Sequence, residues 1–372
     1  MLVPPLRFPE FTEEWRTKSI NDLAVVIGGG TPDTTMKSYW DGEIQWFTPS
    51  EIGKNKYVDL SLRTITKEGL NNSSAKLLPP NTILLSSRAT IGECSLSLRE
   101  CATNQGFQSL VSKKCNVDFL YYLIQTKKKN LIRKSCGSTF LEISANEVRR
   151  IQVSVPSDVE QQKIAELLSL IDERIATQNK IIEDLKKLKS AIRKKVFVSL
   201  KEEHTESCEI NQLLTYEQPT AYIVINDEYS TNTTLIPVLT ANKGFVLGYT
   251  NEDFGIYQKG ECIIFDDFTM DAKYVSFPFK VKSSAIKILT AKPNVNLRFM
   301  FEYISYLRLK SEEHKRHYIS EIASLVIELP SKGKQNRIAN LMTSLDNKLA
   351  LEEKAKARYE DKKRYLLSQM FI

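Results

Sequence analysis

Two segments of the chain carry apolar residues at spacings that alternate between four and three, the pattern of a coiled-coil helix. Each pattern continues for about five heptads, and about 40 helical residues at 1.5 Å each give a rod of roughly 60 Å. The positions that define the two seams are Ile164, Leu168, Ile171, Ile175, Gln178, Ile182, Leu185 and Ile192, then Ile338, Met342, Leu345, Leu349, Glu352, Tyr359 and Leu366. These patterns predict two long helices that pack on each other.

The two helical segments are copies of one another. Residues 156–198 align without a gap to residues 330–372, each residue with the one 174 positions later, and eleven of the 43 pairs are identical. Asp172 with Asp346 is one of the identical pairs. Residues 157–160 spell Ser-x-x-Glu, which predicts a capping box at the start of the first helix. The duplication predicts a chain built as module, helix, module, helix.

Each helix follows a segment in which short apolar runs alternate with turn residues, the pattern of a β-rich module. The first module is expected to hold strands at 44–48, 83–86, 108–111 and 151–155, and a helix at 118–131 with lysines 127–129 in its last turn. The second module is expected to repeat the plan with strands at 236–240, 262–265, 285–289 and 325–329, and a helix at 297–309. The loops between the strands differ almost completely, as two heads that read different targets would require.

The predicted fold class is therefore α+β. Two β-rich domains are separated by two long helices that form an antiparallel coiled coil, with pseudo-twofold symmetry between the halves. The predicted boundaries are 1–155 for the first domain, 156–203 for the first spacer helix, 204–329 for the second domain and 330–372 for the second spacer helix.

Connectivity predicts the antiparallel direction, because the first helix delivers the chain to the second module and the second helix returns. Gln178 and Glu352 then face each other in the middle of the seam, where a polar layer fixes the register at some cost in stability. The neighbouring layers in this register pair Ile171 with Tyr359 and Leu185 with Leu345.

Composition adds a weak indication of the partner. The chain has 52 Lys and Arg against 45 Asp and Glu, a net charge of +7 with an isoelectric point near 8.9, which mildly favours a polyanion. No run of about 18 apolar residues and no secretory signal are visible, so no membrane segment is expected. Six scattered cysteines without a Cys-x-x-Cys pair are expected to be reduced thiols of a cytoplasmic protein.

Motifs for catalysis are missing from the sequence. The glycines at 28–30 lack the strand, loop and helix setting of a nucleotide-binding fingerprint and are expected to form a turn. His314 and His317 lack a third metal ligand, and Asp33 with the triplet at 43–45 lacks the lysine of a nuclease site. We therefore predict no catalytic residue and no metal site, although a nuclease whose site is hidden stays an alternative.

Seven short motifs occur in a fixed order along the first module and helix. They are LRFPEF at 6–11 followed by Trp15, GGTP at 29–32, YW at 39–40, WFTPSEI at 46–52, SRATIG at 87–92, TNQGF at 103–107 and EQQKIA at 160–165. In this order, and with the duplication, they resemble the specificity (S) subunit of type I restriction-modification enzymes over essentially the whole chain. The second module departs from these motifs, and residues 265–269 stand where 86–90 stand in the first, which indicates a different class of target recognition.

The resemblance implies a division of labour. Each module would be a target-recognition domain that reads one half of a bipartite, asymmetric site in double-stranded DNA, and the helices would set the gap and dock two modification (methyltransferase) subunits. Restriction/translocase subunits would join them. The chain itself would be a non-catalytic subunit without cofactor, since S-adenosylmethionine, ATP and Mg²⁺ would belong to the partners, and it would not bind a membrane. A stand-alone DNA-binding scaffold without a modification partner is the alternative.

Base reading needs donors and acceptors on loops that enter a groove, and affinity needs cations on phosphates. The candidates in the first module are Thr31, Tyr39, Thr48, Ser50, Lys54, Lys56, Arg88, Thr90, Asn104, Gln105 and Thr139. Those in the second module are Lys243, Tyr249, Asp266, Asp267, Thr269, Lys273, Lys282, Ser283, Ser284, Lys315, Arg316 and His317. Arg88 is the most specific candidate for a base contact, because a guanidinium can donate to guanine O6 and N7. For the other candidates, a role in a turn, in a cap or on a solvated face is the competing interpretation. The six cations at 186–195 line DNA, meet an acidic partner, or form a solvated face.

Overall fold

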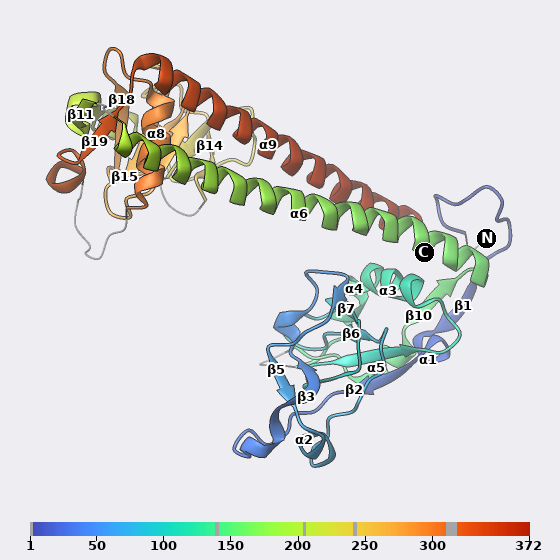
Figure 1. The fold of residues 1–372 in the computed structure, drawn as a ribbon. Coiled ribbons are helices and arrows are strands. Elements are labelled where there is room, and N and C mark those ends of the chain that lie inside the picture. The colour runs from blue at the N-terminus through green and yellow to red at the C-terminus, as the bar shows by residue number, and fades with distance from the viewer. Residues whose placement is uncertain (1–2, 138–140, 204–205, 241–243, 310–317) are drawn as a thin grey trace. The chain divides into compact units, whose positions relative to one another are not determined.

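The computed structural model describes residues 3–137, 141–203, 206–240, 244–309 and 318–372. The chain divides into two compact units. Unit 1 consists of residues 1–179 with 354–372, and unit 2 consists of residues 180–353. Each unit contains one β-rich module and one half of each long helix (Figure 1). The predicted α+β class with two modules and two long helices is confirmed.

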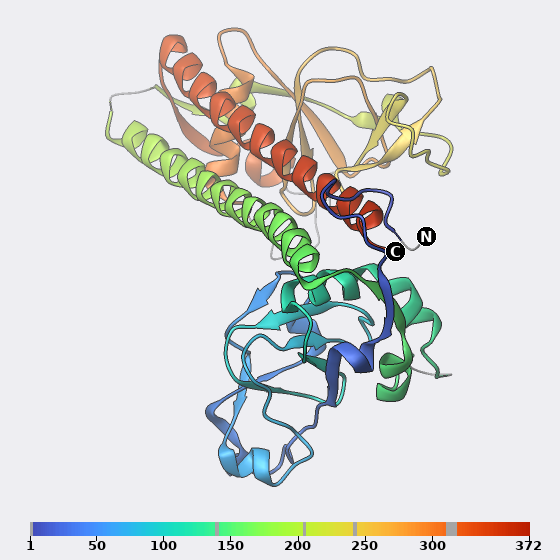
Figure 2. The ribbon, with the colours of Figure 1, turned by 90° about the vertical axis from the view of Figure 1, so that its right-hand side faces the viewer.

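The two long helices are α6 (Asp158–Glu202) and α9 (Lys332–Gln369). Every residue of the predicted seams is buried or half-buried. Within each unit the two helix halves run side by side in opposite directions (Figures 1 and 2). The heptad pattern therefore locates both helices to within a few residues.

One ion pair between the long helices occurs twice. In unit 1, Asp172 of α6 meets Lys363 of α9 at 2.7 Å, and in unit 2, Asp346 of α9 meets Lys189 of α6 at 2.5 Å. The duplication maps Asp172 onto Asp346 and Lys189 onto Lys363. These two contacts are thus the same interaction repeated by the two copies.

The predicted pairing of Ile171 with Tyr359 and of Leu185 with Leu345 stays a prediction. Ile171 lies in the buried cluster that also contains Leu366 and Met370 of α9. The repeated Asp–Lys pair is an interaction that joins the two helices in both units.

The predicted capping box at 157–160 is also wrong. The Glu160 carboxylate, 1% exposed, accepts two hydrogen bonds of 2.7 Å from Arg7 and one of 3.3 Å from Trp15 Nε1. The hydrogen bond to Glu160 raises the pKa of the Arg7 guanidinium above its ordinary value. Glu160 therefore fastens the N-terminal segment to α6 rather than capping the helix.

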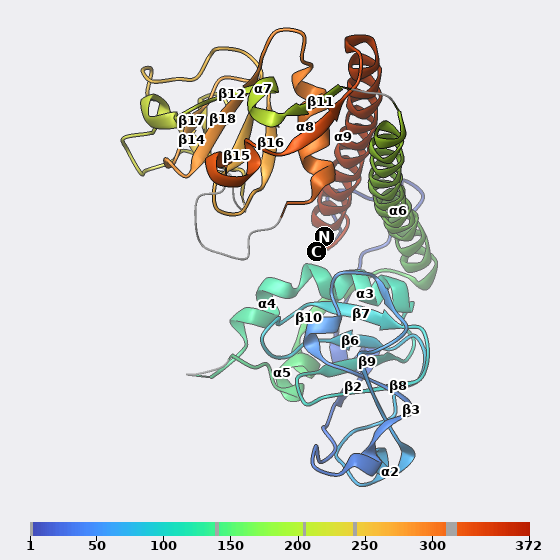
Figure 3. The same cartoon turned by 60° about the vertical axis from the view of Figure 1, so that its left-hand side comes forward.

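The module of unit 1 contains a five-stranded sheet of order β2-β9-β6-β7-β4, a three-stranded sheet of order β5-β3-β8 and the antiparallel pair β1-β10 (Figure 3). Its strands are β1 (Arg16–Ser19), β2 (Ala24–Gly28), β3 (Trp40–Phe47), β4 (Tyr57–Val58), β5 (Arg63–Ile65), β6 (Ile83–Leu85), β7 (Cys94–Ser97), β8 (Cys101–Thr103), β9 (Gln108–Ser112) and β10 (Gln152–Val155). Its short helices are α1 (Ile20–Leu23), η1 (Lys37–Tyr39), η2 (Pro49–Glu51), α2 (Lys67–Asn71), α3 (Val117–Thr126), α4 (Lys128–Arg133) and α5 (Ala145–Arg150).

The helix predicted at 118–131 is in fact two helices, α3 and α4. Lys127, with φ −90° and ψ 4°, leaves helical geometry between them. The lysines at 127–129 therefore lie at and just after the break, not in a last turn. The amphipathic pattern continues across the break, which is why the sequence did not reveal it.

The module of unit 2 contains a four-stranded sheet of order β12-β18-β15-β16, a three-stranded sheet of order β14-β13-β17 and the antiparallel pair β11-β19. Its strands are β11 (Glu206–Glu209), β12 (Leu214–Glu217), β13 (Ile236–Leu239), β14 (Val246–Thr250), β15 (Cys262–Asp266), β16 (Ala272–Val275), β17 (Lys280–Val281), β18 (Ile286–Ala291) and β19 (Val326–Leu329). Its helices are α7 (Ile210–Leu213), η3 (Pro219–Tyr222), α8 (Leu297–Leu307) and η4 (Tyr318–Ile322). The predicted strands and helix of this module are present.

A buried glutamine joins module to helix in the same way in both units. Gln161 donates 3.1 Å to the carbonyl of the proline before α6 and accepts 3.1 Å from the backbone N–H of Asn116, the N-cap of α3. Gln335 donates 2.9 Å to the carbonyl of the proline before α9 and accepts 2.8 Å from the backbone N–H of Asn296, the N-cap of α8. The identity of these two glutamines thus follows from one repeated joint.

The residues beside the repeated ion pair differ between the units. In unit 1, the buried Tyr122 of α3 donates 2.6 Å to Asp172, which also holds Lys363. Burial, followed by the negative charge of Asp172, raises the pKa of the Tyr122 phenol well above its usual range, so it acts as a neutral donor. This group, called the Tyr122 junction below, contains one ion pair.

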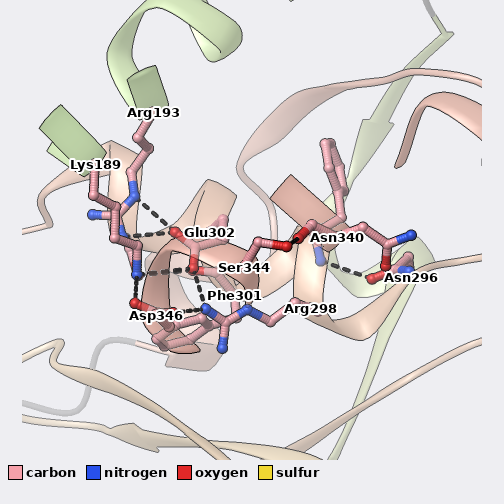
Figure 4. Close-up of polar contacts among 11 residues, drawn as sticks. Lys189, Arg193, Asn296, Arg298, Phe301, Glu302, Asn340, Ser344 and Asp346 are labelled. Atoms are coloured by element: carbon pink, nitrogen blue, oxygen red, sulfur yellow. Dashed lines mark hydrogen bonds and ion pairs between the residues drawn. The ribbon is translucent and has the colours of Figure 1, made fainter. Parts of the chain in front are cut away.

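In unit 2 the corresponding place holds a network of five charges, shown in Figure 4 and called the Glu302 junction below. Glu302 of α8 is 0% exposed and pairs with Arg193 at 2.6 Å, Arg298 at 2.7 Å and Lys189 at 3.4 Å. Lys189 and Arg298 also meet Asp346 of α9. Three cations and two carboxylates thus tie α6, α8 and α9 together.

Candidate nucleic-acid interface

Four loop segments of unit 1 are joined by backbone hydrogen bonds. Gly30 N–H donates to Thr103 at 2.8 Å, Asn104 N–H to Phe47 at 3.1 Å, and Ser87 N–H to the carbonyl of residue 106 at 2.8 Å. Segments 29–32, 47–51, 86–90 and 103–107 are therefore neighbours. They bring together seven of the predicted base-reading residues, Thr31, Thr48, Ser50, Arg88, Thr90, Asn104 and Gln105.

Close approach of the chain explains the glycines at the start of this region. A Cβ added to Gly29 would lie 2.1 Å from the Asn104 carbonyl oxygen, and one on Gly30 would lie 2.2 Å from Ser74 Oγ. Both distances are far below van der Waals contact, so any side chain would push the segments apart. Gly28 ends β2, and Gly29 and Gly30 follow it in extended chain rather than in the predicted turn, so these two glycines serve close packing.

Several of these polar side chains are already bonded within the region. Thr48 Oγ1 donates 2.7 Å to Glu51, Asn104 Oδ1 accepts 2.8 Å from the N–H of residue 106, and Thr31 Oγ1 donates 2.5 Å to Gln105 Oε1. Thr48 and Asn104 shape turns. Gln105 is exposed and keeps its amide N–H₂ group, and Ser50 and Thr90 are exposed as well.

Arg88 lies at the end of β6 on a turn of unusual geometry. Ala89, which follows it, has φ +56°, and Ser86 Oγ donates 2.7 Å to the Arg88 carbonyl. The Arg88 Nη2 atom lies 2.9 Å from Glu142 Oε2, and the two side chains are 43% and 35% exposed. Sequence reasoning missed Glu142, because only the strand-like pairing of distant segments brings it to Arg88 and no local motif marks it.

Three of the predicted DNA-binding residues are wrong, because the fold uses them internally. Lys56, with 6% of its side chain exposed, bonds Asp118 at 2.6 Å and Ser169 at 2.7 Å. Asp266 is 2% exposed and caps the turn after β15 through two backbone N–H groups. Asp267 is 1% exposed and accepts 2.8 Å from a backbone N–H while facing a buried lysine. For Asp266 at the end of β15, the competing interpretation as a turn residue is the correct one.

The remaining candidates stay predictions. Lys54, Thr269, Lys273, Ser283 and Ser284 are exposed, Tyr39 and Tyr249 are half-buried, and Lys282 pairs with Asp227. Thr139, Lys243, Lys315, Arg316 and His317 lie outside the described residues, as does His314.

Most cations of segment 186–195 have partners inside unit 2. Lys186 pairs with Glu353 at 3.0 Å and Lys187 with Glu183 at 2.6 Å, while Lys189 and Arg193 belong to the Glu302 junction. Only Lys194 and Lys195 have no ion pair with the part of the chain that the structure describes. The segment is therefore mainly structural.

The six cysteines are free thiols, and Cys136 is the exposed one. Burial raises the pKa of the Cys94, Cys101, Cys115 and Cys262 thiols to about 12. Within the described ranges, no group of three or more His, Cys, Asp or Glu side chains is placed to hold a metal ion. Nor does any helix described there combine the length and hydropathy needed to cross a membrane.

Comparison with known families agrees with this architecture. The profile described as "Type I restriction modification DNA specificity domain" matches residues 12–187 and again residues 204–360. The chain belongs to this family and carries two copies of its domain. Solved structures of low identity share the fold: the type I restriction-modification S subunit of M. genitalium aligns over 100% of this chain and 99% of that one, with TM-score 0.66 and 16% identity.

Individual relatives match parts of the chain more strongly. The Methanocaldococcus jannaschii MjaIX specificity subunit is 36% identical over 217 residues, 57% of this chain and 50% of the relative. The Escherichia coli EcoR124I/EcoR124II specificity subunit is 45% identical over 127 residues, 32% of this chain and 31% of the relative. The chain thus spans about half or less of these two relatives, whereas the putative MjaX subunit of M. jannaschii is 24% identical over 96% of this chain and 93% of its own length.

Proposed function

We propose that the chain is the DNA-binding specificity subunit of a type I restriction-modification complex. The observation that carries this proposal is the repeat: one joint of module to helix, built on Gln161 and Gln335, occurs twice, while the loops that the modules present differ. Two equal frames with unlike loops suit a bipartite, asymmetric target, each module reading one half. The family relationship supports DNA as the ligand.

In this proposal the chain chooses the site and carries out no bond chemistry. Two modification subunits would bring S-adenosylmethionine and methylate adenine, and restriction/translocase subunits would bring ATP, Mg²⁺ and cleavage. A relative of 13% identity comes from a structure titled for complex assembly of the type I system, which supports such partners. The complex would work in the cytoplasm, where free thiols persist.

A methylome comparison tests the proposal. Genomic DNA from cells with and without the gene is compared for methylated adenine. We expect one split, asymmetric sequence to lose methylation when the gene is deleted and to regain it with a plasmid copy. An unchanged methylome would contradict the proposal.

A second experiment tests how the two half-sites are spaced. The same few residues are inserted into both α6 and α9, so that their pairing is preserved. We expect the two half-sites to stay the same while the gap between them changes. An unchanged gap would show that the helices do not set the spacing.

Two alternatives give different results in the same cells. A stand-alone DNA-binding scaffold would purify without a methyltransferase and leave no methylation mark. A nuclease would cleave DNA with Mg²⁺ as the purified chain, in the absence of other subunits. The proposed subunit co-purifies with a methyltransferase and does not cleave DNA on its own.

A further inference from the structure

Arg88 and Glu142 form an isolated ion pair on the surface of unit 1. Their side chains are 43% and 35% exposed, and the Nη2 and Oε2 atoms are 2.9 Å apart. Neither has a second charged partner among the residues that the structure describes. An exposed pair of this kind contributes only about 0–1 kcal/mol to stability, so the fold does not depend on it.

The backbone, not the reach of two long side chains, sets the geometry of this pair. Arg88 and Glu142 are partners in an antiparallel bridge, and the next residue, Ile143, donates its N–H to Ser87 at 3.1 Å. Glu142 also exchanges backbone bonds of 2.9 and 3.0 Å with Cys136. The pair is therefore held in place before any ligand arrives, which lowers the entropy lost on binding.

The guanidinium of Arg88 has a defined outer edge. Its Nε atom is buried and has no hydrogen-bond partner in the described part of the chain. The two Nη groups, one of them next to Glu142, are thus the donors that remain for a ligand. Ser87 donates its backbone N–H to residue 106, so the chain at Arg88 runs next to the segment of Asn104 and Gln105.

A donor pair beside a carboxylate matches the major-groove edge of one base pair. Guanine presents two acceptors, N7 and O6, and its partner cytosine presents the N4 donor next to them. Arginine donates to the guanine acceptors, and a carboxylate accepts from cytosine N4. At an A·T pair the adenine N6 donor would face the guanidinium and the thymine O4 acceptor would face the carboxylate, so both contacts would be repulsive.

We propose that Arg88 and Glu142 together read one G·C base pair in the half-site that unit 1 recognises. The proposal rests on the proposed function, since it names the bases that this interface selects. Glu142 is a specificity-determining residue in two ways: it accepts from cytosine, and it orients the guanidinium toward guanine. The pair also has a direction, so it distinguishes G·C from C·G.

The test is a binding selection from randomised DNA duplexes. It uses the full chain with any methyltransferase that co-purifies with it. The wild type should select a bipartite site with a G·C pair in one half. Arg88→Ala and Glu142→Ala should each relax that same base pair, with the preference for it falling about tenfold or more, while the other half-site stays unchanged. The double variant should lose little more than either single variant.

A matched control is available in the same unit. Arg99 and Asp59 form another exposed pair, 2.6 Å apart with side chains 53% and 44% exposed. Arg99→Ala should leave every base preference intact. Tryptophan fluorescence of each variant should match the wild type, which excludes a folding defect.

The outcomes separate the two proposals. If the wild type selects a split site but Arg88→Ala and Glu142→Ala relax different positions or none, this inference is wrong and the proposed function stands. If the wild type selects no sequence at all, both the proposed function and this inference are wrong. Relaxation at one shared G·C pair supports both.

Discussion

The Tyr122 junction and the Glu302 junction contain the same Asp–Lys ion pair but differ in the side chains that surround it. In both, an aspartate of one long helix meets a lysine of the other, Asp172 with Lys363 and Asp346 with Lys189. At the Tyr122 junction a neutral phenol donates a hydrogen bond to the aspartate of the pair. At the Glu302 junction a buried carboxylate pairs with the lysine of the pair and with two arginines (Figure 4).

The substitutions that separate the junctions are coupled. Counting from the N-caps of α3 and α8, Tyr122 stands where Glu302 stands, and in the duplicated helices Leu367 stands where Arg193 stands. A buried carboxylate needs compensating charge, and unit 2 supplies it with Arg193 and Arg298. The comparison teaches that a duplicated frame keeps its central pair while its neighbours change together, in charge and in size.

The largest expected effect is that of Glu302→Gln. It leaves Lys189 and Arg298 with Asp346, and it leaves Arg193 without a carboxylate among the described residues. Breaking a buried pair on one side costs about 3–5 kcal/mol. Urea unfolding followed by far-UV circular dichroism should show unit 2 unfolding at a lower midpoint; urea is chosen because it does not screen charges.

Tryptophan fluorescence is the internal control for this variant. The chain has three tryptophans, at positions 15, 40 and 46, and all belong to unit 1. Their transition should not move when Glu302 is changed. An unchanged circular dichroism midpoint would mean that the cations of unit 2 do not need this carboxylate.

The second prediction separates the units by pH. Cys94, Cys101 and Cys115 of unit 1 have pKa values raised to about 12 by burial, from an ordinary value of 9.0, against Cys262 alone at that value in unit 2. Between pH 9 and 12 the unfolded chain releases these protons while the folded chain keeps them, so stability is intact below pH 9 and falls as pH rises.

At pH 10 the loss is about 1.4 kcal/mol per buried thiol, thus about 4 kcal/mol for the three thiols of unit 1. The urea midpoint from tryptophan fluorescence should fall between pH 8 and 10 by more than the midpoint of unit 2. Cys94→Ala, compared with itself at the two pH values, should reduce this fall by about a third. Burial also raises the pKa values of tyrosines in both units, such as Tyr121 and Tyr318, so the thiol variant is the decisive comparison. An unchanged fall in Cys94→Ala would contradict the assignment to thiols.

The sequence predicts the repeated frame well, because heptads and alternating strands are local patterns. Residues such as Gln161 and Gln335 are recognisable as identical, but their common role depends on N-caps that lie 45 and 39 residues away. The repeated Asp–Lys pair could not be predicted in this way, since Asp172 and Lys363 are 191 positions apart and no local pattern joins them.

The candidate site is predictable to a smaller degree. Loop motifs correctly bring Thr31, Arg88 and Gln105 into one region, since the strands that carry them are predicted. Lys56 and Asp266 fail, because a charged residue in a loop looks the same in sequence whether it faces solvent or bonds its own fold. Glu142 was missed for the opposite reason, since its role depends on a distant partner.

The third prediction concerns the Tyr122 junction. Tyr122→Phe removes the 2.6 Å hydrogen bond to Asp172 but leaves Lys363 in place. A hydrogen bond to a charged group contributes about 1.5–3 kcal/mol, and because Asp172 stays paired we expect the lower end, about 1.5 kcal/mol. Fluorescence-monitored urea unfolding measures the loss in unit 1. Tyr303→Phe in unit 2, where the hydroxyl only accepts a 3.4 Å bond, is the matched control. Its loss is measured by the circular dichroism transition of unit 2 and should be small; an equal loss from both variants would speak against a special role of Asp172.

The smallest expected effect comes from the most drastic change. Glu302→Met combined with Arg193→Leu removes one buried acid and one base together, and leaves Lys189 and Arg298 paired with Asp346. Replacing buried ion pairs by apolar groups of similar size is often neutral or stabilising, so we expect stability within about 1 kcal/mol of the wild type. Arg193→Leu alone should lie between the double variant and Glu302→Gln, measured by the same circular dichroism transition. If the double variant is as unstable as Glu302→Gln, the geometry of the ion-pair network itself stabilises unit 2, and apolar side chains cannot replace it. If the double variant is as stable as the wild type, the charges of unit 2 specify a unique packing arrangement and do not raise its free energy of unfolding.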